Sequence, residues 1–132
     1  MLEQARARIL VVDDESAIRL TVDAVLRRQG YEVATAANGE EALGWLMQKA
    51  FDLVLIDLKL PGMNGLQFAH YAQRCQPGMA ILFLTGSSDF NGLPVEMQVG
   101  HFDYVLKTAS PEEVLEAVAN ALDHQFVMRR AA

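Results

Sequence analysis

Three short runs of consecutive apolar residues constrain the fold of this chain more than any other feature. Each run is four or five residues long, and they lie at Ile9–Val12, Leu53–Ile56 and Ala80–Leu84. Uninterrupted apolar runs of this length are typical of strands that are buried on both faces of a parallel sheet. Two further stretches predict strands, namely Tyr31–Ala36, which alternates like an edge strand, and Phe102–Leu106.

Helical patterns fill the intervals between these strands. Apolar residues at helical spacing predict helices over Ser16–Gln29, from Asn38 onward, over Asn64–Gln76, and from Ser110 to about Arg129. Asn38 and Ser110 are each followed three residues later by a glutamate, which is a signal for a helix start. A fifth, short helix is expected near Pro94. The alternation predicts an α/β fold: a three-layer, doubly wound, five-stranded parallel sheet with five helices.

The length and composition fit one domain. A chain of 132 residues with 52% hydrophobic residues can bury a core, which excludes an intrinsically disordered protein. We expect an N-terminal extension over residues 1–7, the domain over residues 8–128 and a tail over residues 129–132. The apolar runs are far shorter than a membrane span, and no signal-peptide pattern follows Met1. The sequence therefore predicts a cytoplasmic protein without membrane contact.

Charge and cysteine content exclude two kinds of function. The net charge is −6 and the isoelectric point is near 4.9, so the domain is predicted to make no direct contact with nucleic acid. Cys75 is the only cysteine, which excludes an internal disulfide and a cysteine-based metal site. We expect Cys75 to pack as a small apolar side chain.

Polar residues follow four of the five predicted strands. Right-handed crossovers place the carboxyl ends of all parallel strands at one edge of the sheet, where ligands bind in such folds. The first strand is followed by Asp13 and Asp14, the third by Asp57, the fourth by Thr85 and the fifth by Lys107. We therefore expect these five side chains to meet, although 94 residues of sequence separate the first from the last.

These residue types point to phosphoryl transfer. Three carboxylates in one crevice repel one another unless a cation neutralises them, and oxygen ligands favour Mg²⁺, with Mn²⁺ or Ca²⁺ as alternatives. Lys107 and the Thr85 hydroxyl are predicted to contact phosphate oxygens. Asp13 and Asp14 are neighbours suited to hold the metal, whereas Asp57 ends a central strand. We predict Asp57 as the nucleophile that forms an acyl phosphate.

The chain resembles the receiver domain of two-component response regulators over about residues 7–128. The resemblance rests on motifs that follow one another in order, at residues 9–15 (Ile-Leu-Val-Val-Asp-Asp-Glu), 57–65 (Asp-Leu-Lys-Leu-Pro-Gly-Met-Asn-Gly), 84–86 (Leu-Thr-Gly) and 102–107 (Phe-Asp-Tyr-Val-Leu-Lys). Each motif is weak alone, but each falls at the end of a predicted strand. The resemblance implies the flavodoxin-like strand order 2-1-3-4-5 and a role in a phosphorelay.

The same resemblance implies a role for each site residue. Asp57 would accept the phosphoryl group from a phosphohistidine on a sensor histidine kinase, or from a phosphotransfer protein, and Lys107 would contact a phosphoryl oxygen. Thr85 would then move toward the phosphoryl group, and Tyr104 would rotate inward. The implied Mg²⁺ ligands are Asp14, Asp57 and the backbone carbonyl of Lys59, with Asp13 acting through water.

Output and context also follow from the resemblance. The fourth helix, fifth strand and fifth helix would form the surface that controls an output domain or a downstream protein, and a phosphorylation-dependent homodimer is compatible with this. The weak helix around Pro94–Gly100 is our candidate for the two-state element. We expect a signalling switch, not an enzyme, which catalyses only its own Mg²⁺-dependent phosphorylation and dephosphorylation. We also expect either a stand-alone receiver or, by a slight preference, one excised from a longer regulator or hybrid kinase.

One position departs from the family pattern. The family usually has proline after the conserved lysine, joined by a cis peptide bond that aims the ammonium group, whereas Thr108 follows Lys107 here. A non-proline cis bond costs about 2.5–4 kcal/mol. We hypothesise that Lys107–Thr108 is nevertheless cis, so that the lysine reaches the site.

Two other functions remain as alternatives. A phosphatase of the haloacid-dehalogenase type also uses an aspartate nucleophile, but Lys59 stands where that family has a second acid, and no cap domain is present. An unphosphorylated pseudo-receiver, acting as a docking or dimerisation module, is favoured only by the missing proline after Lys107.

Overall fold

The structure of the chain is a computed structural model that describes residues 6–86 and 103–131, with side chains described as far as Asp123. Its strands are β1 (Arg8–Val12), β2 (Glu32–Ala36), β3 (Leu53–Asp57), β4 (Ala80–Thr85) and β5 (Asp103–Leu106). Its helices are α1 (Ser16–Gln29), α2 (Gly39–Gln48), α3 (Gly65–Cys75) and α5 (Pro111–Ala131). The predicted helix near Pro94 and the first residue of the predicted fifth strand, Phe102, lie outside the described residues.

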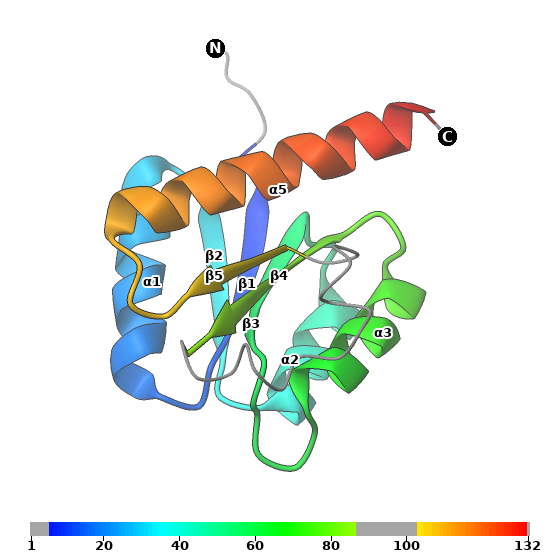
Figure 1. The fold of residues 1–132 in the computed structure, drawn as a ribbon. Helices are drawn as coiled ribbons and strands as arrows, with labels where there is room; N and C mark the ends of the chain where they lie inside the picture. Colours follow the sequence, from blue (N-terminus) through cyan, green and yellow to red (C-terminus); the bar gives the residue numbers. More distant parts are fainter. Residues whose placement is uncertain (1–5, 87–102, 132) are drawn as a thin grey trace.

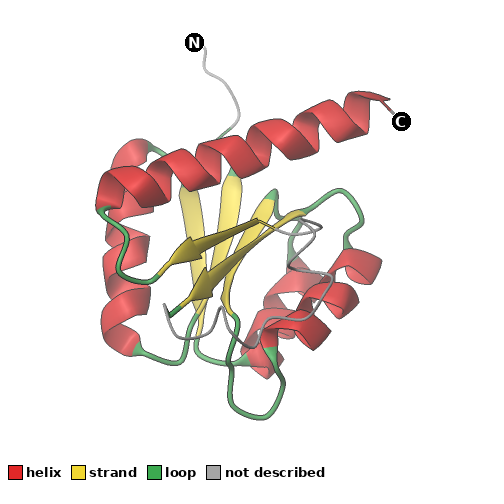
Figure 2. Cartoon of the chain, in the orientation of Figure 1, coloured by secondary structure: helices red, strands yellow, loops and turns green. Residues whose placement is uncertain are grey.

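All five strands form one parallel sheet in the order β2-β1-β3-β4-β5 (Figure 1). The predicted fold class and strand order are thereby confirmed, with β2 at an edge and β3 in the centre. Helices α1 and α5 cover one face of the sheet, and α2 and α3 cover the other (Figure 2). The described residues contain four helices, and the fifth that the sequence predicts falls on residues outside the described part of the chain.

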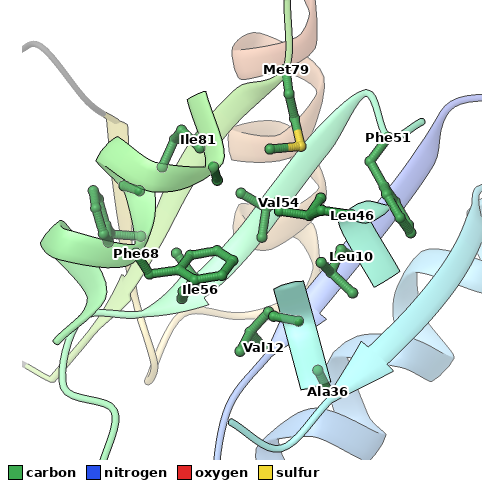
Figure 3. Close-up of a cluster of buried hydrophobic side chains, with 14 of the residues drawn as sticks. Leu10, Val12, Ala36, Leu46, Phe51, Val54, Ile56, Phe68, Met79 and Ile81 are labelled. Atoms are coloured by element: carbon green, nitrogen blue, oxygen red, sulfur yellow. The ribbon is translucent and has the colours of Figure 1, made fainter. Parts of the chain in front are cut away.

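The alternation of side chains along each strand divides the core into two halves. Leu10, Val12, Val54 and Ile56 point to the α2–α3 side, where they pack with Phe68 and other apolar residues (Figure 3). The intervening strand residues pack on the opposite side against α1 and α5, and the members of that half include Ile9, Val11, Leu53, Leu55, Val22, Leu26, Val114 and Val118. Because both strand faces are covered, the three central strands must be apolar at every position, which explains the uninterrupted runs.

Local capping signals determine several of the helix ends. The Asn38 side chain accepts a hydrogen bond from the backbone N–H of Glu41 at 2.9 Å, as the sequence predicted. Ser110 and Glu113 form a reciprocal capping box, in which each side chain accepts a hydrogen bond from the backbone N–H of the other. Helix α1 ends at Gly30, whose φ of 105° lies in the left-handed region that glycine adopts without strain.

Helix α5 is the longest element, with 21 residues. Val114, Val118 and Ala121 bury one side of it against the sheet, and its C-terminal part extends beyond the sheet (Figure 1). None of the helices in the described part of the chain combines the length and the apolar character that crossing a membrane requires.

Cys75 does not pack as the sequence suggested. It is exposed at the last position of α3, whereas Ala69 and Ala72 on the same helix are fully buried. The expectation was wrong because residue type alone does not say which side of a helix end faces the core.

Candidate functional site

Three aspartates meet at the carboxyl edge of the sheet. Asp13 directly follows β1, Asp14 comes next, and Asp57 is the last residue of β3. Each offers a carboxylate oxygen, and these oxygens lie within 4.8 Å of one another. Asp13 and Asp57 are buried and Asp14 is exposed. The structure thus brings together the three acids that the sequence singled out, with one side of the cluster open to solvent.

Backbone N–H groups orient the two buried carboxylates. The N–H of Glu15 donates to Asp13 Oδ1 at 2.8 Å, and the N–H of Lys59 donates to Asp57 Oδ1 at 3.0 Å. In each case the donor is two residues further along the chain, so a tight local turn holds the carboxylate. The Arg19 guanidinium also donates to the backbone carbonyl of Asp13 at 2.6 Å. The Oδ2 atoms of both aspartates are left for other partners.

Lys107 reaches these Oδ2 atoms from the turn after β5. Its ammonium nitrogen lies 2.9 Å from Asp57 Oδ2 and 3.3 Å from Asp13 Oδ2, and the side chain is only 18% exposed. Its third partner is Glu15 Oε1, at 2.8 Å. The backbone N–H of Lys107 donates to the carbonyl of Thr85 at 2.8 Å, which ties the turn to the end of β4.

Thr85 and Tyr104 occupy different environments. Thr85 is fully buried at the end of β4, and its hydroxyl oxygen has no hydrogen-bond partner in the described structure. Tyr104 lies on β5 opposite Phe83 and is 41% exposed. The tyrosine is therefore near the surface in this structure, and the inward rotation implied by the resemblance stays a prediction.

The site residues fit a divalent cation of the Mg²⁺ class. Asp13 Oδ2 is buried and accepts no hydrogen bond, and the Lys107 ammonium lies 3.3 Å from it as an ion-pair partner, so this oxygen keeps the capacity to bind a cation. Three carboxylates face one lysine, which leaves the cluster with excess negative charge, and all the candidate ligand atoms are hard oxygens. Asp14, on the exposed side, gives a hydrated ion access to the cluster.

Burial sets the protonation behaviour of the acids. Burial raises the pKa of Asp57, against the opposing effects of the Lys59 hydrogen bond and of Lys107, while the charge of Asp14 raises it further. Burial also raises the pKa of Asp13, and the negative charge of Asp57 raises it further. Burial would lower the pKa of Lys107, but hydrogen bonds to Glu15 and Asp57 and the nearby carboxylate charges raise it above its usual range. Lys107 is therefore a permanent cation at neutral pH.

The hypothesis of a cis bond between Lys107 and Thr108 is wrong. The described residues contain no cis peptide bond, and Lys107 is in the site all the same. The trans bond avoids the cost of a non-proline cis bond, and the four-carbon side chain of lysine is long enough to span the remaining distance from a trans backbone.

Sequence reasoning missed two residues of this site. Gly65 begins α3 and lies against the loop that follows Asp57 (residues 58–64, the Asp57 loop). A Cβ atom at Gly65 would lie 2.6 Å from the Asp57 carbonyl oxygen. A signal was present, because glycine is a poor helix former and stands at a first helical position. Glu15 was quoted only as part of a motif, although it contacts Lys107 across 92 residues of sequence. No local sequence pattern predicts such a contact.

Comparison with known proteins identifies the same family for most of the chain. The sequence profile of the response regulator receiver domain matches residues 9–119. A receiver domain protein described as CheY-like, from Methanospirillum hungatei, has a solved structure that matches with a TM-score of 0.84 and 33% identity, covering 94% of this chain and 99% of that one.

Curated relatives extend beyond the region of similarity. The DNA-binding response regulator MtrA of Mycolicibacterium smegmatis is 36% identical over 117 residues, which cover 89% of this chain and 51% of MtrA. The alginate biosynthesis transcriptional regulatory protein AlgB of Pseudomonas aeruginosa is 37% identical over 120 residues, which cover 91% of this chain and 27% of AlgB. The chain thus spans about half of one relative and about a quarter of the other.

Proposed function

The chain belongs to the response regulator receiver domain family, and we propose that it accepts a phosphoryl group on Asp57 in a Mg²⁺-dependent reaction and thereby switches an output partner. The phosphoryl donor is a phosphohistidine on a sensor histidine kinase or on a phosphotransfer protein. The observation that carries the proposal is the position of Asp57, buried at the end of the central strand with the Lys107 ammonium 2.9 Å from its Oδ2 atom.

The proposed chemistry uses the residues of the acidic cluster. A carboxylate oxygen of Asp57 attacks phosphorus, the new O–P bond forms as the P–N bond to histidine breaks, and the histidine nitrogen takes the electron pair. Lys107 stabilises the negative charge on a phosphoryl oxygen, because it carries a fixed positive charge beside the acceptor. When bound, Mg²⁺ neutralises phosphoryl and carboxylate charge. The proposed ligands are Asp14, Asp57, the carbonyl of Lys59, and Asp13 through water.

An apolar groove beside the site supports a protein as donor. A cavity of about 190 Å³ lies between α1 and α5, lined mainly by apolar side chains, and Lys107 is among its lining residues. A groove lined by apolar side chains is typical of a surface that binds another molecule, and a protein donor fits its place beside Lys107. We propose that this phosphoryl transfer takes place in the cytoplasm.

The proposed output is a change of surface rather than turnover of a substrate. Phosphorylation adds nearly two negative charges to the cluster, and Thr85 and Tyr104 respond as the switch residues. The affected surface comprises the fourth helix, β5 and α5, and it acts on an output domain or a downstream protein, or forms a homodimer. The relatives named as transcriptional or DNA-binding regulators support the proposal of an output domain elsewhere in a longer protein. The net charge of −6 favours no direct contact of the receiver itself with nucleic acid.

Incubation with Mg²⁺ and acetyl phosphate, followed by intact mass measurement, tests the proposal. We expect a transient gain of one phosphoryl group that is absent in Asp57→Asn and without Mg²⁺. Asp52→Asn is the matched control, because Asp52 directly precedes β3, at the end of the strand opposite to Asp57. Repeated hydrolysis of a general phosphoester would favour the phosphatase alternative. No adduct with acetyl phosphate or phosphoramidate would contradict the proposal and favour a docking module that is not phosphorylated.

A further inference from the structure

Glu15 is the residue before α1, and its side chain is not used to cap that helix. Its backbone is extended, as at a normal N-cap, but its carboxylate accepts no hydrogen bond from the helix N–H groups. The carboxylate instead lies 2.8 Å from the Lys107 ammonium nitrogen. Glu15 is 58% exposed and Lys107 is 18% exposed, so Glu15 covers the ammonium group from the solvent side.

The three partners of Lys107 are not equivalent once a cation enters. Asp57 Oδ2 and Asp13 Oδ2 belong to the acidic cluster, whose oxygens lie close enough together to hold a metal ion. Glu15 is not part of that cluster. A divalent cation bound by the aspartates attracts their oxygens and repels the ammonium at the same time. Glu15 is then the carboxylate that still attracts Lys107.

The backbone gives Lys107 little help in staying in place. Its N–H bonds to the Thr85 carbonyl, but the following bond to Thr108 is trans and lacks the proline ring that would restrict the turn. The lysine side chain has four rotatable bonds and a strongly hydrated head group, so its position depends on its charged partners.

We propose that Glu15 is a positioning residue that keeps the Lys107 ammonium beside Asp57 when a divalent cation occupies the aspartates. This inference rests on the proposed phosphoacceptor function. Glu15 touches neither the acceptor carboxylate nor the phosphoryl group, and acts only through Lys107.

Nuclear magnetic resonance of the lysine ammonium groups tests this in the unphosphorylated protein. The chain has only three lysines, so the Lys107 signal is identified by its loss in Lys107→Met. With saturating Mg²⁺, we expect a slowly exchanging Lys107 ammonium signal in the wild type. In Glu15→Gln this signal broadens or moves to the position of a solvated lysine, and Glu15→Asp restores it in part. Glu40→Gln removes one charge from an exposed first-turn residue of α2 and serves as the control.

A kinetic cycle gives a second, independent readout. At saturating Mg²⁺, Glu15→Gln should slow acetyl phosphate labelling about threefold to fivefold, as expected for a half-exposed ion pair. In the Lys107→Met background the same substitution should cause no further change. An unchanged ammonium signal in Glu15→Gln, or an equal kinetic effect without Lys107, would overturn the inference. Because the spectra are recorded without phosphorylation, their outcome is separate from the outcome for the proposed function.

Discussion

Replacing Gly65 with alanine should damage both the stability of the domain and the placement of Asp57. The added Cβ would lie 2.6 Å from the Asp57 carbonyl oxygen, 2.8 Å from Leu58 Cα and 3.0 Å from the Leu58 carbonyl oxygen. Ordinary contact begins at 3.4 Å, so the helix start and the Asp57 loop must separate by about 0.8 Å. All three contacted atoms are backbone atoms, which cannot rotate away.

The magnitude follows from two costs and one gain. Overpacking costs about 1–3 kcal/mol, and loss of the 2.8 Å hydrogen bond from the Gly65 N–H to the Leu58 carbonyl costs about 1 kcal/mol. The higher helix propensity of alanine returns at most about 1 kcal/mol. The expected net loss is about 1–3 kcal/mol, or roughly 3–12 °C in the melting temperature of a domain of this size.

Thermal and urea unfolding measure this loss, and acetyl phosphate labelling measures the effect on Asp57. Gly44→Ala is the matched control, because a Cβ there has no neighbour within 4 Å, and it should stabilise the protein by up to about 1 kcal/mol. We expect Gly65→Ala to label more slowly than wild type at a temperature where both are folded. A Gly65→Ala protein with wild-type stability and labelling rate would refute the close approach of α3 to the Asp57 loop.

Three further predictions concern the stability of the unphosphorylated domain. Burial raises the pKa of Asp13 and Asp57, so the folded protein loses stability as the pH rises above 3.8 through the raised pKa values. Without divalent ions, the melting temperature of Asp13→Asn should therefore exceed that of the wild type by an amount that grows between pH 4 and 7, and Mg²⁺ should reduce this difference. A difference that stays constant with pH would count against the prediction. Gly30→Ala should cost about 1 kcal/mol in urea unfolding, because alanine is strained at a φ of 105°, and a neutral result would contradict the left-handed cap. Gln76→Ala should lower the free energy of unfolding by about 2 kcal/mol, because the Gln76 side-chain amide makes three hydrogen bonds to backbone groups. The control Gln48→Ala, at an exposed position, should change it by less than about 0.5 kcal/mol. Equal changes in the two variants would show that the three hydrogen bonds contribute nothing.

The sequence was most informative where structure depends on neighbours along the chain. Buried strands, capping boxes and the glycine after α1 were all readable, because hydrophobic periodicity and backbone preference act over a few residues. The gathering of Asp13, Asp14 and Asp57 was also predictable, since parallel strands joined by right-handed crossovers end at one edge. Burial was harder to predict, as exposed Cys75 shows.

The tertiary structure alone decided how the site is held together. The contact of Glu15 with Lys107 has no local signature, because it joins residues that are 92 positions apart in the sequence. The glycine at the start of α3 was a local hint, but the closeness of Gly65 to the Asp57 carbonyl depends on how α3 packs on the sheet. The amino-acid pattern by itself determined that the parallel strands end at one edge of the sheet, and which acids lie at that edge. Packing determined how closely their oxygens approach one another, and that Glu15, outside the cluster, also contacts the lysine.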